Sequence, residues 1–249
     1  MQKIRLSDTE LVKGSNTGVY GAMKVGKSHF TKILALNYYL QGKPVFILDH
    51  NFNDDTYGDF WGIKPEIVTL EEFTSINWAY ESRDLVVRVQ KEHPMAEFDH
   101  NAFFACAGAM KYNVFILDDL GDIFGNQATT AIKNFPATTV NNYNEVFYQF
   151  HNLYQAHPFL RGKLQNIVLK SLPIDSTIPE DFLTPSKIIR ACLKEIEVEN
   201  KPLPFKKKFA WRYLHADDQL VTMPKKLRID GQREEYVTYL QSEYFENKL

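Results

Sequence analysis

The residues most suited to chemistry form a short glycine-rich segment at 21–28, GAMKVGKS. It fits the pattern G-x-x-x-x-G-K-[ST], which is typical of loops that bind the phosphates of a nucleoside triphosphate. The glycines let backbone N–H groups approach phosphate oxygens, and Lys27 supplies a positive charge for the β- and γ-phosphates. The Ser28 hydroxyl is a hard oxygen ligand suited to Mg²⁺. The segment therefore predicts a site for ATP and Mg²⁺, with contacts from Gly21, Lys24, Val25, Gly26, Lys27, Ser28 and His29.

Two adjacent carboxylates, Asp118 and Asp119, follow the apolar run Val114–Leu117. Such a run is typical of a buried parallel strand, so the acids are expected at its carboxyl end. One carboxylate there can hold the magnesium shell, and a second can polarise the attacking water. We assign Asp118 to the metal and Asp119 to the role of general base. Acidic strand ends are often only solvated; the combination with a loop about 90 residues earlier favours the catalytic interpretation.

A further polar pair, His151 and Asn152, follows the predicted strand Glu145–Phe150. If this strand lies between the loop strand and the acidic strand, the pair could reach the γ-phosphate or the water. An ordinary strand-terminal turn explains the pair equally well. Asn152 is the preferred catalytic candidate, because a neutral amide can orient water at any pH near neutrality.

Several basic residues have alternative interpretations. Lys24 could contact a phosphate in cis or across a subunit interface, but we favour a solvated side chain. Oligomeric ATPases often borrow an arginine from a neighbouring subunit, and Arg161, Arg190 and Arg212 are available. Nothing in the sequence selects among them. Arg161 is the first choice, although a surface arginine is the commoner case.

Basic and aromatic residues alternate at 206–213, and a second basic group lies at 225–228. This pattern suits a surface that follows a phosphate backbone and stacks on bases. A solvated edge strand protected by lysines is at least as good an explanation.

The elements that must position these residues alternate between short apolar runs and helical periodicity. Val19 and Tyr20 end a short strand before the loop, and a helix is predicted over 28–40. Beyond Val45–Leu48, Val114–Leu117 and Glu145–Phe150, we expect a strand at 164–172, helices at 99–112 and 179–198, short elements at 66–73 and 85–89, and a connector at 135–143. This order predicts an α/β fold with a doubly wound, mostly parallel sheet. The ATPase core spans 1–200, and a short extension, 201–249, packs on it or on a neighbouring subunit.

Composition restricts the function classes. The 249 residues carry a net charge of −2, so the chain lacks the strong positive field of many nucleic-acid-binding proteins, and any DNA contact would be local. The apolar runs are too short to cross a bilayer, and the N-terminus has no signal pattern, so we expect a cytoplasmic protein. Cys106 and Cys192 are expected to be buried, reduced thiols, and no metal cluster is predicted.

Together these residues resemble the additional-strand (ASCE) branch of P-loop ATPases, in which an extra strand with a polar tip stands between the loop strand and the acidic strand. Within that branch the chain looks like the HerA/FtsK superfamily, and specifically like viral genome-packaging ATPases and Zot-type phage proteins. The likeness covers about residues 15–200, although only the two nucleotide motifs are specific. Asp119 stands where many relatives carry Glu, and His151 and Asn152 replace the usual glutamine of the extra strand. These departures bear on hydrolysis rather than on ATP binding.

The resemblance implies an ATP-hydrolysing translocase of double-stranded DNA that works as a homo-oligomeric ring. Such a motor would package a viral genome into a capsid, with capsid or portal-vertex proteins as partners, in the host cytoplasm or associated with the virion. The alternative is a Zot-like assembly or extrusion ATPase, or a nucleotide-gated scaffold. A small-molecule kinase is a third option, but the sequence shows no cluster of arginines for its lid.

Overall fold

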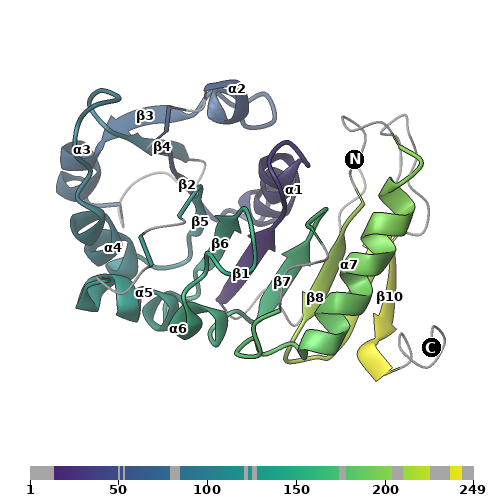
Figure 1. Cartoon of the computed structure of the whole chain (residues 1–249). Coiled ribbons are helices and arrows are strands. Elements are labelled where there is room, and N and C mark those ends of the chain that lie inside the picture. Colours follow the sequence, from purple (N-terminus) through teal and green to yellow (C-terminus); the bar gives the residue numbers. More distant parts are fainter. Residues whose placement is uncertain are drawn as a thin grey trace.

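The computed structural model describes residues 14–49, 51–52, 54–78, 85–120, 123–124, 128–173, 178–203, 210–224 and 236–242. These residues form an α/β fold around one sheet, with helices on both sides of it (Figure 1). In chain order the elements are β1 (Ser15–Tyr20), α1 (Lys27–Tyr39), β2 (Val45–Leu48), α2 (Asp54–Tyr57), β3 (Glu66–Thr69), α3 (Leu70–Ser75), β4 (Val86–Gln90), α4 (His100–Ala109), β5 (Val114–Leu117), α5 (Thr130–Asn141), β6 (Glu145–Phe150), α6 (Pro158–Arg161), β7 (Asn166–Leu169), α7 (Ser186–Asn200), β8 (Arg212–His215), β9 (Leu220–Pro224) and β10 (Tyr236–Leu240).

The sheet has the strand order β10-β9-β8-β7-β1-β6-β5-β2-β4-β3. The strands from β7 to β3 pair in parallel, and β8, β9 and β10 continue the sheet in antiparallel order. The prediction of a doubly wound, mostly parallel sheet is confirmed. Strand β6 lies between β1 and β5, so the extra strand stands between the loop strand and the acidic strand.

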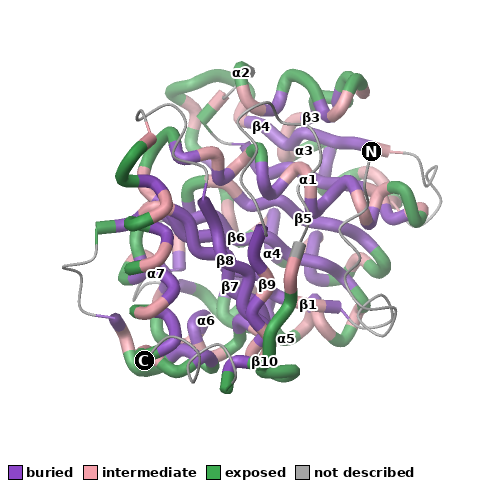
Figure 2. The backbone as a smooth tube through the Cα atoms, turned by 90° about the vertical axis from the view of Figure 1, so that its right-hand side faces the viewer, coloured by how far each residue is buried: buried purple, intermediate pink, exposed green. Residues whose placement is uncertain are grey.

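Successive side chains along the strands point to opposite faces of the sheet, so a hydrophobic core forms on each face. In β6, Tyr148 and Phe150 face the larger core, which includes residues of α4, α5 and α7. Phe147 faces the smaller core beneath α1, which contains Phe30 and Leu34. Figure 2 shows the central strands as mostly buried, whereas the helices alternate between buried and exposed residues. The site residues that follow these strands are therefore carried by a rigid, buried scaffold.

Most predicted elements are present: the three apolar strands β2, β5 and β6 have the predicted bounds, whereas the helices predicted at 99–112 and 179–198 begin later. Helix α4 starts at His100 because the Asp99 carboxylate caps it by accepting from the N–H groups of Asn101 and Ala102. Helix α7 starts only at Ser186, since Pro185 immediately precedes it.

The predicted connector at 135–143 is wrong, because most of it belongs to helix α5. Pro136 lies inside this helix and removes one backbone donor, which made the segment look non-helical. Burial of Ile132, Phe135 and Thr139 against the sheet and α4 outweighs that local cost. Tertiary packing therefore decides the structure of this segment.

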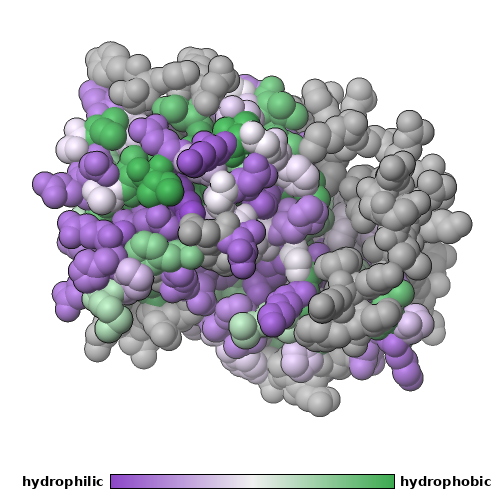
Figure 3. Space-filling model, turned by 90° about the horizontal axis from the view of Figure 1, so that it is seen from above, coloured by the Kyte–Doolittle hydropathy of each residue, from purple (hydrophilic) through white to green (hydrophobic). Residues whose placement is uncertain are grey.

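The described part of the C-terminal extension joins the same sheet as the core. Strand β8 pairs with β7, so this part of the extension packs on the core of its own chain. No described helix has the length and apolar character needed to span a membrane. Cys192 is buried in the larger core, as expected, whereas Cys106 is only half-buried. On the face seen in Figure 3, hydrophilic side chains predominate among the described residues, with hydrophobic ones in small groups.

Candidate functional site

The phosphate-binding loop joins β1 to α1 and depends on two glycines. Gly26 has a φ of 78°, a left-handed conformation that side chains disfavour, directly before the first turn of α1. A Cβ on Gly21 would lie 2.8 Å from Cγ2 of Val25 and 3.0 Å from Cβ of Lys170, so a larger residue does not fit. The N–H groups in the first turn of α1 point toward the loop, and a helix end of this kind suits an anion. The loop thus has the geometry expected from its sequence.

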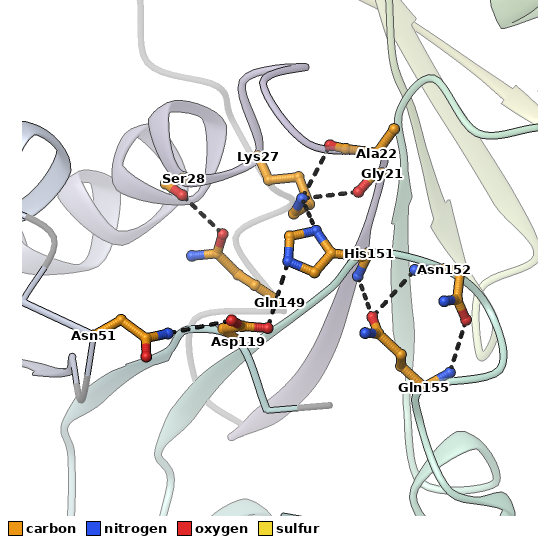
Figure 4. A network of polar contacts seen from close by, with 10 residues as sticks. All are labelled: Gly21, Ala22, Lys27, Ser28, Asn51, Asp119, Gln149, His151, Asn152 and Gln155. Atoms are coloured by element: carbon orange, nitrogen blue, oxygen red, sulfur yellow. Dashed lines mark hydrogen bonds and ion pairs between the residues drawn. The ribbon is translucent and has the colours of Figure 1, made fainter. Parts of the chain in front are cut away.

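Lys27 is the first residue of α1, and its ammonium group lies at the centre of the site (Figure 4). It donates to the carbonyl oxygens of Gly21 at 2.8 Å and of Ala22 at 3.1 Å, and it lies 3.1 Å from Nδ1 of His151. Burial lowers the pKa of Lys27, and the nearby carboxylates of Asp118 and Asp119 oppose this shift. A partly desolvated cation of this kind is placed to bind phosphate.

The two acids follow β5 and reach the same edge of the sheet as the loop, because β6 pairs in parallel with both β5 and β1. Burial raises the pKa of Asp118 from 3.8 to about 6; a hydrogen bond from Tyr57 opposes this, and the negative charges of Asp49 and Asp119 add to it. Asp119 is more exposed and has a φ of 51°, a conformation that Asp tolerates better than most residues. Asp118 is thus a desolvated carboxylate that a bound cation would stabilise.

His151 connects Lys27 to Asp119 through its two ring nitrogens. An ammonium group has no lone pair, so Nδ1 accepts from Lys27, and Nε2 carries the hydrogen that faces Oδ1 of Asp119 at 3.4 Å. Burial lowers the pKa of His151, the charge of Lys27 lowers it further, and Asp119 opposes both. Nδ2 of Asn51 donates to the other carboxylate oxygen of Asp119 at 3.2 Å. The neutral imidazole of His151 therefore orients the Asp119 carboxylate from one side, and the amide of Asn51 orients it from the other.

Asn152 has a different role from the one expected. Its side-chain oxygen accepts from the N–H groups of Tyr154 at 2.9 Å and Gln155 at 3.0 Å, which closes the turn after β6. The Gln155 side chain in turn accepts from the backbone N–H groups of His151 and Asn152 (Figure 4). The preference for Asn152 over His151 does not fit this geometry. Asn152 therefore belongs to the strand-terminal turn, whereas His151 lies in the candidate site.

Arg161 is placed inside the chain rather than at its surface. Its Nε donates to Oδ1 of Asp181 at 2.7 Å, another guanidinium nitrogen donates to the carbonyl of Ala156, and the group lies over the ring of Phe182. An arginine offered to a neighbouring subunit has to be exposed, so Arg161 does not fit that role. Of the other two candidates, Arg212 is buried in ion pairs with α7, whereas Arg190 is exposed.

Two residues that the sequence analysis missed bridge the loop and the acids. The Ser28 hydroxyl donates to Oε1 of Gln149 at 3.1 Å, and Nε2 of Gln149 donates to the Tyr57 hydroxyl at 2.9 Å. Tyr57 is in turn hydrogen-bonded to Asp118. The extra strand therefore brings a glutamine into the site, two residues before His151. The alternation of β6 could have shown this, since Gln149 and His151 share a face.

A buried ion pair lies beside these residues. Nε and Nη2 of Arg88 donate to Oδ2 of Asp49 at 2.8 and 2.5 Å, and both residues are almost fully buried. Asp49 follows β2, the neighbour of β5, so it is the acid next to Asp118 along the sheet edge. Because Arg88 already neutralises Asp49, Asp118 is the better candidate for a metal ligand.

The donor set fits a triphosphate together with Mg²⁺. Ser28 and the desolvated carboxylate of Asp118 supply hard oxygens, and Lys27 with the helix end supplies the phosphate contacts.

Lys24 is exposed with a φ of 62°, and exposed His29 packs its ring 5.4 Å from that of Trp61. Contacts of Lys24, Val25 and His29 with the nucleotide stay predictions.

The basic and aromatic segment divides into two parts. Residues 206–209 and 225–228 lie outside the described residues. Trp211, Arg212 and Tyr213 are buried, and Trp211 packs on Phe30 of α1 at a centroid distance of 4.7 Å. These three residues stabilise the sheet and are not accessible for stacking on bases.

No family model matches this sequence, and no curated protein matches it. Among solved structures, the genome packaging NTPase B204 from Sulfolobus turreted icosahedral virus 2 in complex with ATP-gammaS matches with a TM-score of 0.58, at 14% identity over 86% of this chain and 98% of that chain. Its complex with AMP gives 0.57, at 14% identity over 86% and 97%. The DNA-packaging ATPase B204 from Sulfolobus Turreted Icosahedral Virus gives 0.54, at 16% identity over 86% and 98%. At such identities the likeness establishes the fold: this chain has the P-loop ATPase fold of these viral packaging NTPases.

Proposed function

We propose that this chain is an ATPase that couples hydrolysis to the movement of double-stranded DNA, and that it packages a viral genome. One observation carries the hydrolytic part of the proposal: His151, directly after β6, lies between Lys27 of the phosphate loop and Asp119 of the acidic strand. Lys27, the proposed phosphate-binding cation, and Asp119, the proposed base, thus lie on either side of one neutral imidazole. A site that only bound nucleotide would have no use for the fixed carboxylate.

Each residue has a distinct task in this proposal. Lys27 and the N–H groups of the loop bind the β- and γ-phosphates. Ser28 and Asp118 would hold Mg²⁺, which neutralises phosphate charge when it is bound. Asp119 orients the attacking water and takes its proton on a carboxylate oxygen, while His151 holds the carboxylate in place. Figure 4 shows the contacts of Lys27, Asp119 and His151 on which their tasks rest.

DNA enters the proposal from the likeness to B204, which is a genome-packaging NTPase or DNA-packaging ATPase in these structures. A ring and capsid partners follow from the family resemblance that the sequence motifs carry. A homo-oligomeric ring would also explain where a catalytic arginine comes from, since Arg161 and Arg212 form ion pairs within their own chain. We propose Arg190 of α7, which is exposed, as the first candidate for a residue donated between subunits. Capsid or portal-vertex partners, in the host cytoplasm or the virion, complete the proposal.

The direct test is the rate of ATP hydrolysis by the purified, assembled protein with and without double-stranded DNA. We expect DNA to raise the rate, and single-stranded DNA of equal nucleotide content serves as the control. Electron microscopy of the same sample with nucleotide and DNA would report the ring. An assembled ring whose turnover ignores DNA would contradict the translocase.

A nucleotide-gated scaffold, or a Zot-like extrusion ATPase, is the alternative outcome of this test. Tight nucleotide binding with no turnover by the wild-type protein would favour the scaffold. Turnover that responds to a particle or membrane fraction but not to DNA would favour extrusion.

A further inference from the structure

We infer that Tyr57 is a positioning residue that fixes the two proposed magnesium ligands, Ser28 and Asp118, relative to each other. The inference rests on the proposed function, because it concerns the same nucleotide site. Tyr57 lies at the end of α2, in the segment that follows β2, and its side chain is fully buried. Neither the loop motif nor the acidic strand contains it.

Tyr57 completes a continuous path of hydrogen bonds across four elements. The path runs from Ser28 in α1 to Gln149 in β6 at 3.1 Å, and from Gln149 to the Tyr57 hydroxyl at 2.9 Å. From there it reaches Asp118 after β5, and the Tyr57 hydroxyl is also hydrogen-bonded to Ser28 directly. The loop helix and the acidic strand are therefore connected by side chains and not only by the sheet between them.

The direction of each bond follows from the groups themselves. An ionised carboxylate can only accept, so Tyr57 gives its single proton to Asp118, and its oxygen is then free to accept from Nε2 of Gln149. The Gln149 amide is oriented by this contact, which leaves its carbonyl oxygen to accept the proton of Ser28. A serine that ligates a metal must present a lone pair, so its proton has to point elsewhere. The path directs that proton away from the metal position.

Loss of the Tyr57 hydroxyl would remove the group that sets the directions of these hydrogen bonds. In Tyr57→Phe, Nε2 of Gln149 loses its acceptor, and the amide is free to rotate and donate to Ser28. The serine lone pair would then be occupied by an amide hydrogen instead of Mg²⁺. Asp118 would also lose a donor that orients its carboxylate. Outer-shell partners of metal ligands are commonly worth about 10- to 100-fold in metal affinity.

The test measures binding of a fluorescent, non-hydrolysable ATP analogue while Mg²⁺ is titrated, and again in EDTA. Tyr57→Phe is expected to raise the Mg²⁺ concentration at half-effect by about 10- to 100-fold, with analogue affinity in EDTA unchanged. Turnover should recover at saturating Mg²⁺, which damage to the fold would not allow. Gln149→Leu should reproduce the shift, and the double variant should add little to either single change, because both act on one path.

Tyr148→Phe is the matched control. Tyr148 is also fully buried, precedes Gln149 in β6, and donates its hydroxyl proton to Oδ1 of Asn16 at 3.1 Å on the other face of the sheet. It should keep the wild-type Mg²⁺ dependence. A Tyr57→Phe protein with the wild-type Mg²⁺ midpoint would overturn the inference. If hydrolysis proved independent of DNA while the Mg²⁺ shift was present, only the proposed translocase would fail.

Discussion

Nζ of Lys27 lies 3.1 Å from Nδ1 of His151, so the loop lysine and the tip of the extra strand are in direct contact. The imidazole faces Asp119 with its other nitrogen. Through this one ring, the group that would bind the γ-phosphate is linked to the group that would activate water. A phosphate bound in the loop would compete with His151 for the ammonium group of Lys27. This competition would alter the contact between His151 and Asp119.

His151→Ala is expected to reduce turnover more than nucleotide binding. The change removes one hydrogen bond to a charged lysine and one to a charged carboxylate, each worth about 1.5–3 kcal/mol. Only the bond to Asp119 bears on the water-activating step, and since about 1.4 kcal/mol is tenfold in rate, its loss should lower kcat about 10- to 100-fold. Steady-state hydrolysis and nucleotide titration together measure the two effects. His93→Ala, at an exposed loop position, is the control, and an unchanged kcat in His151→Ala would contradict the link.

Lys27→Ala should abolish nucleotide binding while the protein stays folded. The ammonium group donates to the carbonyl oxygens of Gly21 and Ala22 inside the loop, where it is placed to bind phosphate. Calorimetric titration with ATP measures the loss, and thermal unfolding checks the fold. Lys133→Ala, on the exposed face of α5, should bind as the wild type does. Retained hydrolysis in Lys27→Ala would remove the central assignment.

Asp119→Asn should bind nucleotide normally and hydrolyse it poorly. Asn tolerates the left-handed backbone at this position as well as Asp does, so the fold should be unaffected. An amide cannot take the proton of the attacking water, and loss of a positioned base typically costs about 10²- to 10⁴-fold in rate. Single-turnover hydrolysis separates this step from product release. A variant with wild-type kcat would show that another group is the base.

The free energy of unfolding should decrease at acidic pH because of the buried His215 in β8. Burial lowers its pKa from 6.5 to about 4, against the opposing charge of Asp218. The unfolded chain therefore binds this proton at a higher pH than the folded one. The stabilising contribution is complete above pH 6.5 and is lost as the pH falls through 4, by roughly 3 kcal/mol in total.

Urea unfolding of the wild type and of His215→Gln at several pH values between 7 and 4 measures this contribution. The difference between their unfolding free energies should shrink steadily as the pH falls across this range. His93→Gln should instead follow the wild-type curve, because that side chain is exposed. Parallel curves for wild type and His215→Gln would rule out a buried neutral imidazole.

The loop and the acidic strand could be predicted from the sequence because their information is local. Gly26 needs its left-handed φ, Gly21 has no room for a side chain, and Lys27 and Ser28 follow at a fixed spacing. Four consecutive apolar residues before Asp118 are enough to indicate a buried strand end. These features also led to the correct fold class. Helix α5 was missed because Pro136 is unfavourable locally and is tolerated only through packing.

The remaining site depends on which side chains meet between elements far apart in the chain, and only the tertiary structure decided that. The order β1-β6-β5 places His151 against Lys27 and turns Asn152 into a turn residue. It also sets Gln149 and Tyr57 between Ser28 and Asp118, although Tyr57 is 29 residues from the serine and belongs to no motif. A sequence alone determines which groups can bind phosphate and metal, because those groups are encoded by residue type and spacing. It does not determine which neighbours orient them, because hydrogen-bond partners are chosen by strand order and packing.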